Sequence, residues 1–164
     1  MKKLMLALAM VVMLSSVAAA QECFNAKGSA VVTGIVSYYA DNQWRDFNSF
    51  WVTNISSSAV TCRVRVFDQD GMDVTNFCSV STGSSGKKFK TIATGTGTFE
   101  LPAGATRMVH FIATNHAIMG HAIIDWTSED NNLRKALIST FRMYKTEANR
   151  GFMSTTPVNN GQPF

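Results

Sequence analysis

Apolar and polar side chains alternate strictly along residues 60–66, and this alternation limits the fold of the chain more than any other feature. Valine or cysteine occupies the even positions of the run, and threonine or arginine occupies the odd positions between them. Successive side chains of a β-strand point to opposite faces, so such a strand has one buried and one solvated face. The run therefore predicts an antiparallel strand whose even positions, Val60, Cys62, Val64 and Val66, point into the core.

Comparable short runs recur at intervals of roughly ten residues along the chain. They are rich in Val, Ile, Thr and Phe, and Gly, Asn and Asp separate them, which is typical of strands joined by turns. Residues 128–145 also allow a helical face, and we expect at most a short helical turn before a final strand. Seven to eight strands predict an all-β fold, an immunoglobulin-like antiparallel β-sandwich. The predicted strands cover residues 29–39, 47–55, 59–68, 72–80, 96–101, 106–114, 117–126 and 135–145. The pattern is generically similar to exported immunoglobulin-like sandwiches of bacteria, and no motif ties the chain to a named family.

The four residues from Asp68 to Gly71 predict a tight turn between two of these strands. A type I turn followed by glycine in the left-handed region places Asp68 opposite Met72. Continued along both strands, this register places Cys62 opposite Cys78, within reach of a disulfide. We therefore predict a Cys62–Cys78 disulfide, with Cys23 unpaired or used between chains. The alternative pairings join Cys23 to either of the other two cysteines.

The first twenty residues have the three parts of a secretory signal. Lys2 and Lys3 precede an uncharged apolar run, and Ala18 and Ala20 supply the small side chains that a signal peptidase accepts. The apolar run is shorter than the ~20 residues that cross a bilayer. We therefore expect cleavage after Ala20, export to the periplasm or an extracellular location, and no membrane span after cleavage. We expect the chain after the signal to consist of a β-sandwich domain at 21–151 and an extended carboxy-terminal segment at 152–164.

The charge of the exported part is close to balanced. Loss of Lys2 and Lys3 from the 15 basic side chains leaves 13 against 11 acidic ones. The densest basic stretch, residues 87–90, is interpreted as a solvated loop or strand edge, and not as a nucleic-acid surface. We therefore expect no nucleic acid among the partners of this chain.

The residues that could carry chemistry do not form a recognisable catalytic motif. His110, His116 and His121 lie near Asp125 in the sequence, but His121 and Asp125 are ~13 Å apart along one straight strand. The acidic residues around Gly71 do not match the spacing of a calcium loop. We therefore expect no cofactor, no metal and no catalytic residues. A metal-dependent hydrolase that uses the histidines ranks third among the functions considered, after the two binding functions described next.

Aromatic side chains support the binding interpretations. Trp44 lies in a polar stretch close to Tyr38 and Tyr39, which is the setting of a glycan-binding surface as well as of a protein interface. Trp51 and Trp126 are expected to fill the core instead. The leading hypothesis is a non-enzymatic binding or assembly module that acts through protein–protein contacts or self-association. A glycan-binding module using Trp44, Tyr38 and Tyr39 is the alternative.

The carboxy-terminal segment is the second candidate for an interface. It carries no charged side chain after Arg150, contains Phe152 and finishes on Phe164. Disordered ends are usually polar and charged, so this composition favours an ordered segment. We therefore predict that residues 157–164 lie against the fold or against a neighbouring copy, with Phe152 and Phe164 as interface residues.

Overall fold

The computed structural model describes residues 24–41, 44–95, 97–111, 116–148 and 150–164. These residues form ten antiparallel strands, which confirms the predicted all-β class. The predicted signal and Cys23 lie outside the described residues. The elements are β1 (Gly28–Tyr39), β2 (Trp44–Asn54), β3 (Val60–Phe67), η1 (Thr75–Phe77), β4 (Cys78–Thr82), β5 (Lys90–Thr94), β6 (Thr98–Leu101), β7 (Thr106–Phe111), β8 (Ile118–Thr127), β9 (Leu137–Glu147), β10 (Arg150–Pro157) and η2 (Val158–Gly161).

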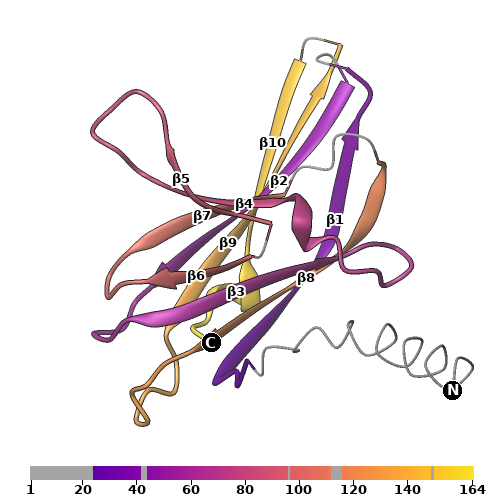
Figure 1. Cartoon of the computed structure of the whole chain (residues 1–164). Helices are drawn as coiled ribbons and strands as arrows, with labels where there is room; N and C mark the ends of the chain where they lie inside the picture. Colours follow the sequence, from indigo (N-terminus) through magenta and orange to yellow (C-terminus); the bar gives the residue numbers. More distant parts are fainter. Residues whose placement is uncertain (1–23, 42–43, 96, 112–115, 149) are drawn as a thin grey trace, which may run out of the picture.

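The strands join into one continuous sheet that almost closes into a barrel. Its order is β5-β4-β7-β2-β1-β8-β3-β6, and β9 pairs with β2 while β10 pairs with β9 (Figure 1). β1 connects the two halves, because it pairs with β8 over most of its length and with β2 at Tyr38 and Tyr39. This closure differs from the expected sandwich of seven to eight strands in two separate sheets, since β1 continues from one layer into the other.

Gly95 and Gly97, which lie between β5 and β6, bond to the strands on the two sides of the remaining gap of the barrel. The amide of Gly95 donates to the carbonyl oxygen of Cys78 at 2.9 Å, and the amide of Val64 donates to that of Gly97 at 2.8 Å. Gly97 has φ +63°, and a Cβ there would lie 1.9 Å from the Val64 carbonyl oxygen. Because a side chain at this position would clash with the backbone, the position requires glycine.

The core forms as the alternation predicts. The even positions of β3 are at most 2% exposed, and Phe50, Phe111 and Trp126 on other strands are completely buried. Trp126 thus fills the core as expected. Trp51 does not, because its neighbour Phe50 takes the inward position and leaves Trp51 on the outer face of β2.

The hairpin after β3 follows the predicted register for a short distance and then departs from it. Gly71 has φ +78°, the Asp68 amide donates to the Met72 carbonyl, and Phe67 pairs with Asp73. The chain then turns through η1, which the Thr75 side chain holds by accepting a hydrogen bond from the Val66 amide at 2.9 Å.

This turn interrupts the predicted strand at 72–80, of which residues 78–80 lie in β4, and it overturns the predicted disulfide. β4 begins at Cys78 and pairs with β7 instead of β3, so Cys78 lies opposite Phe111. Cys62 lies opposite Phe99 and Trp126. Both thiols are free and buried, and the register argument is therefore wrong beyond Val74.

The last residues lie against the fold, in agreement with the prediction for 157–164. Val158 is 4% exposed and Phe164 is 8% exposed. The main-chain oxygen of Phe164 accepts hydrogen bonds from the amides of Ala136 and Leu137 and from the indole nitrogen of Trp126. The extended segment predicted from residue 152 contains most of β10, which begins at Arg150.

Candidate functional site

The outer face of β7, β2, β9 and β10 brings together side chains that are far apart in the sequence. Cross-strand register places Ser49 between His110 and Arg142, and it places Thr155 beyond Arg142. Side chains opposite each other on one face of a sheet are near neighbours. This polar row is flanked on one side by Met108, Trp51 and Thr140 and on the other by Phe47, Tyr144 and Met153.

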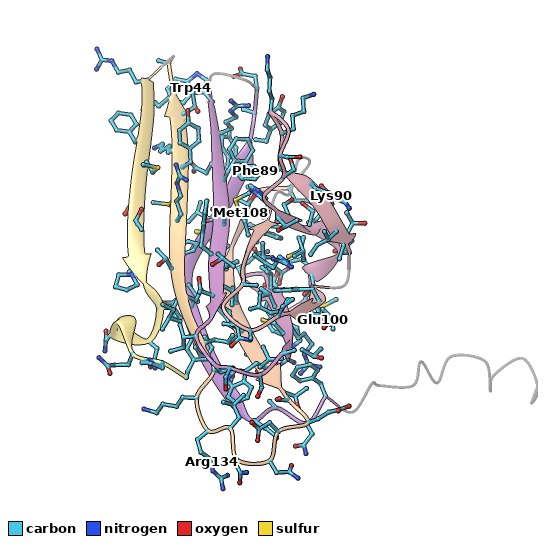
Figure 2. All side chains as sticks on the ribbon, turned by 90° about the vertical axis from the view of Figure 1, so that its left-hand side faces the viewer. Trp44, Phe89, Lys90, Glu100, Met108 and Arg134 are labelled. Atoms are coloured by element: carbon cyan, nitrogen blue, oxygen red, sulfur yellow. The ribbon has the colours of Figure 1, made fainter. Side chains whose placement is uncertain are left out.

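This face is hollowed by a groove, which we call the outer groove. One part has a volume of about 410 Å³ and lies over β7, β2 and β9, and the other has about 370 Å³ and reaches β10. Trp51 and Arg142 line both parts. Phe89 extends over the first part from the connection between β4 and β5, close to Met108 (Figure 2).

Two polar groups of the outer groove have few partners. The indole nitrogen of Trp51 is buried and has no hydrogen-bond partner among the described residues. The guanidinium of Arg142 donates through Nε to the sulfur of Met153 and forms no ion pair within the part of the chain described. Burial lowers the pKa of His110, so this imidazole is neutral near pH 7 and Arg142 carries the positive charge of the lining.

β10 forms an open edge beside the outer groove. All eight of its residues are exposed, including Phe152 at 53% and Met153 at 59%. Among the described strands it pairs with β9 alone, in an uninterrupted register from Arg150 to Pro157. An edge strand presents a row of unpaired backbone N–H and C=O groups to solvent. β10 can therefore accept a further strand.

The aromatic residues predicted to bind a glycan lie at one end of the β1–β2 hairpin. Tyr38, Tyr39 and Trp44 are 43%, 37% and 42% exposed. The Trp44 amide donates to the Asp41 carboxylate at 3.0 Å. Figure 2 shows Trp44 at one end of the molecule, and none of the three residues lines the outer groove.

The two predicted interface residues have different surroundings. Phe152 projects from the open edge strand, whereas Phe164 is buried within its own chain. Phe164 therefore contributes to the core of this chain, and an interface role for Phe152 stays a prediction.

The three histidines lie on different parts of the fold. His110 is on the outer groove, His121 stacks on Phe67 with ring centroids 5.1 Å apart, and His116 lies against Phe77. Within the described ranges, no cluster of three or more His, Cys, Asp or Glu side chains could hold a metal ion. In the same residues, no helix has the length and hydropathy required to span a membrane.

The buried thiols are poorly suited to nucleophilic chemistry. Burial, together with the nearby charge of Asp125, raises the pKa of Cys62. Burial and the charge of Asp73 raise the pKa of Cys78 to about 12. Because the thiolate is the reactive form, both cysteines stay protonated and unreactive at neutral pH.

Sequence reasoning missed the outer groove. The alternation of Ile138, Thr140, Arg142 and Tyr144 could have shown that they share one face of the last predicted strand. Their proximity to Met108 and Trp51 depends on pairing between strands that are distant in the chain, so no local pattern indicates it.

Comparison with known proteins gives a likeness of fold. No family model matches the chain, and no curated protein matches it. A solved structure, "Crystal Structure of Thermotoga maritima 1070", matches with a TM-score of 0.51 and 8% sequence identity, over 84% of this chain and 99% of that chain. At this identity the match shows a similar fold and nothing about activity.

Proposed function

We propose that this chain is a non-enzymatic, exported assembly module in which the β10 edge pairs with the β10 edge of a second copy. The observation that carries the proposal is the open, exposed strand β10, which has no charged side chain after Arg150. Natural proteins usually protect such edges with short strands, charges or bulges. β10 has none of these along Gly151–Thr156, and Pro157 stops the ladder only at its end.

A second copy is a suitable occupant because antiparallel pairing of identical strands follows a two-fold axis. With the axis near Ser154, the two Arg150 side chains lie at opposite ends of the pair, roughly 25 Å apart. No other charged side chain occurs between residues 151 and 164, so the paired strands bring no like charges together. Phe152 and Met153 would lose exposed apolar surface, which favours association.

The test is the mass of the mature chain in solution, measured by light scattering after size exclusion at micromolar concentrations. We expect a dimer for the unchanged chain. Ser154→Lys, which adds a charge to the middle of β10, should weaken the dimer by at least about tenfold, since edge lysines oppose strand addition.

The matched control is Asn131→Lys, which adds the same charge at an exposed turn between β8 and β9. It should leave the dimer unchanged. A monomer at all concentrations, or a dimer that is indifferent to Ser154→Lys, would show that β10 is not the contact between copies.

Glycan binding at the β1–β2 hairpin is a second candidate function. It is favoured by the joint exposure of Tyr38, Tyr39 and Trp44, since aromatic faces with a polar tip suit sugar rings. A glycan array probed with the unchanged chain and with Trp44→Ala separates the two functions. Binding that depends on Trp44 supports the glycan module, whereas absence of binding leaves assembly as the function.

We also propose that the near-closed barrel is an elaborated immunoglobulin-like sandwich. Two groups of paired strands support this interpretation: β1-β8-β3-β6 and β5-β4-β7-β2-β9-β10. In this arrangement β1 belongs to the first layer and reaches the second at Tyr38 and Tyr39.

A further inference from the structure

We infer that the outer groove binds a small anionic molecule with a flat apolar body, such as an aromatic carboxylate or sulfonate. The ligand of this site is a small molecule, whereas the β10 edge is proposed to bind a second copy of the chain. The outer groove also shares no residue with the aromatic cluster Tyr38, Tyr39 and Trp44. The inference rests on the apolar walls of the groove, on its uncompensated positive charge and on an unsatisfied hydrogen-bond donor.

The walls suit a flat ring. Phe47 and Tyr144 lie nearly parallel, with ring centroids 6.3 Å apart and planes 9° apart. Met108 is 7% exposed and forms part of the floor, and Phe89 is 62% exposed and lies over it. Open apolar grooves of several hundred Å³ with a few polar groups are typical of ligand sites. A ring that enters the groove can stack on aromatic faces and cover Met108.

The charge of the groove indicates the sign of the ligand. Arg142 lines both parts of the groove, and no carboxylate does so among the described residues. Lys87 and Lys88 are exposed on the same loop as Phe89, and the exposed Lys90 begins β5 directly after it. A guanidinium binds carboxylates and sulfonates through paired hydrogen bonds. A cationic ligand would be repelled, and a neutral apolar ligand would leave Arg142 without a partner.

A third observation locates the acceptor atoms. The indole N–H of Trp51 is buried without a partner among the described residues, on a side chain that also lines both parts of the groove. Buried donors in folded proteins are nearly always paired, so an unpaired one marks a place for an acceptor. An anionic ligand supplies acceptor oxygens to Arg142, and it supplies one to the Trp51 N–H once the indole turns toward the groove.

The experiment measures displacement of the fluorescent probe anilinonaphthalene sulfonate by naphthaleneacetate and by the neutral analogue naphthaleneethanol. We expect the unchanged chain to bind the carboxylate at least about tenfold more tightly than the alcohol, because a charged hydrogen-bonded pair is lost with the alcohol. Arg142→Met keeps an unbranched apolar chain about as long as the arginine stem but removes the charged guanidinium, so it should remove this preference. Arg142→Lys keeps the charge and should retain part of it.

The matched control is Arg134→Met, which removes one positive charge at the opposite end of the molecule from Trp44 (Figure 2). It should leave the preference unchanged, and a circular dichroism melt of each variant shows whether it is folded. Equal affinity for the carboxylate and the alcohol would overturn the inference. So would failure of naphthaleneacetate to displace the probe, or a preference that persists in folded Arg142→Met.

Discussion

Replacing Phe164 by alanine tests how the end of the chain is held. The substitution removes a buried ring but keeps the main-chain oxygen that accepts hydrogen bonds from Trp126, Ala136 and Leu137. The ring is 8% exposed and belongs to the same core cluster as Trp126. The experiment therefore measures the packing of one side chain, separately from its backbone contacts.

The expected loss follows from the burial of the ring. Phe→Ala substitutions in cores cost about 3–5 kcal/mol, and sites that can collapse into the space left behind fall at the lower end. Phe164 follows a short 3-10 segment at the surface, so partial collapse is expected and we predict a loss of about 3 kcal/mol. For a domain of this size this corresponds to a fall in Tm of roughly 10 °C.

The assay is urea unfolding of the mature chain, with tryptophan fluorescence as the signal that reports unfolding. Phe152→Ala is the matched control, because it removes the same ring from a 53% exposed position in the same part of the chain. It should change the free energy of unfolding by no more than about 0.5 kcal/mol. If the two variants are equally stable, Phe164 does not pack in the core and the docking of the end is refuted.

Two further substitutions test Gly97 at the barrel gap and the charge network on β3 and β8. Gly97→Ala should cost about 3 kcal/mol or more, because its Cβ would meet the Val64 oxygen. Gly104→Ala has a similar φ in open space and should cost only about 1 kcal/mol in the same unfolding assay, and equal losses would contradict the clash. Burial alone would raise the pKa of Asp125, but hydrogen bonds from Arg63 and Ser29 and the charge of Arg65 outweigh it and hold the pKa below its ordinary value. Because the pKa of Asp125 is lower in the folded chain than its value near 4 in the unfolded chain, the ionised carboxylate stabilises the fold above about pH 4. The free energy of unfolding should therefore fall as the pH drops below about 4, and Asp125→Asn should flatten that part of the stability–pH curve.

β3 and the turn at Gly71 could be predicted from the sequence, whereas the neighbouring η1 could not, and the reasons are physical. The even positions of β3 were predictable because burial on one face imposes a period of two on the sequence itself. The turn at Gly71 was predictable because its φ requires glycine. The departure at η1 was not, since it depends on a hydrogen bond from the Val66 amide to the Thr75 side chain, which no alternation of apolar residues indicates.

The outer groove and β10 illustrate a second limit of prediction from sequence. Residues 150–157 have no alternation, because both faces of β10 are exposed and burial imposes no pattern on them. Ser49, His110 and Arg142 meet only because β7, β2 and β9 are adjacent in the sheet, although the three strands are not consecutive in the chain. Hydrophobic patterning therefore identifies the buried side of this fold but not the residues that share its outer surface.

The edges of the sheet differ in a way that connects the fold with the proposed function. β5 and β6 end the main sheet with five and four residues, and they carry the charged residues Lys90 and Glu100. Short and charged edges resist pairing with another chain. β10 is eight residues long and has no charge after Arg150. If edge protection were uniform, this strand would also carry a lysine or glutamate near its middle. The missing charge at Ser154 is therefore the feature that favours contact between copies, and adding a lysine there restores the protection that the other two edges already have.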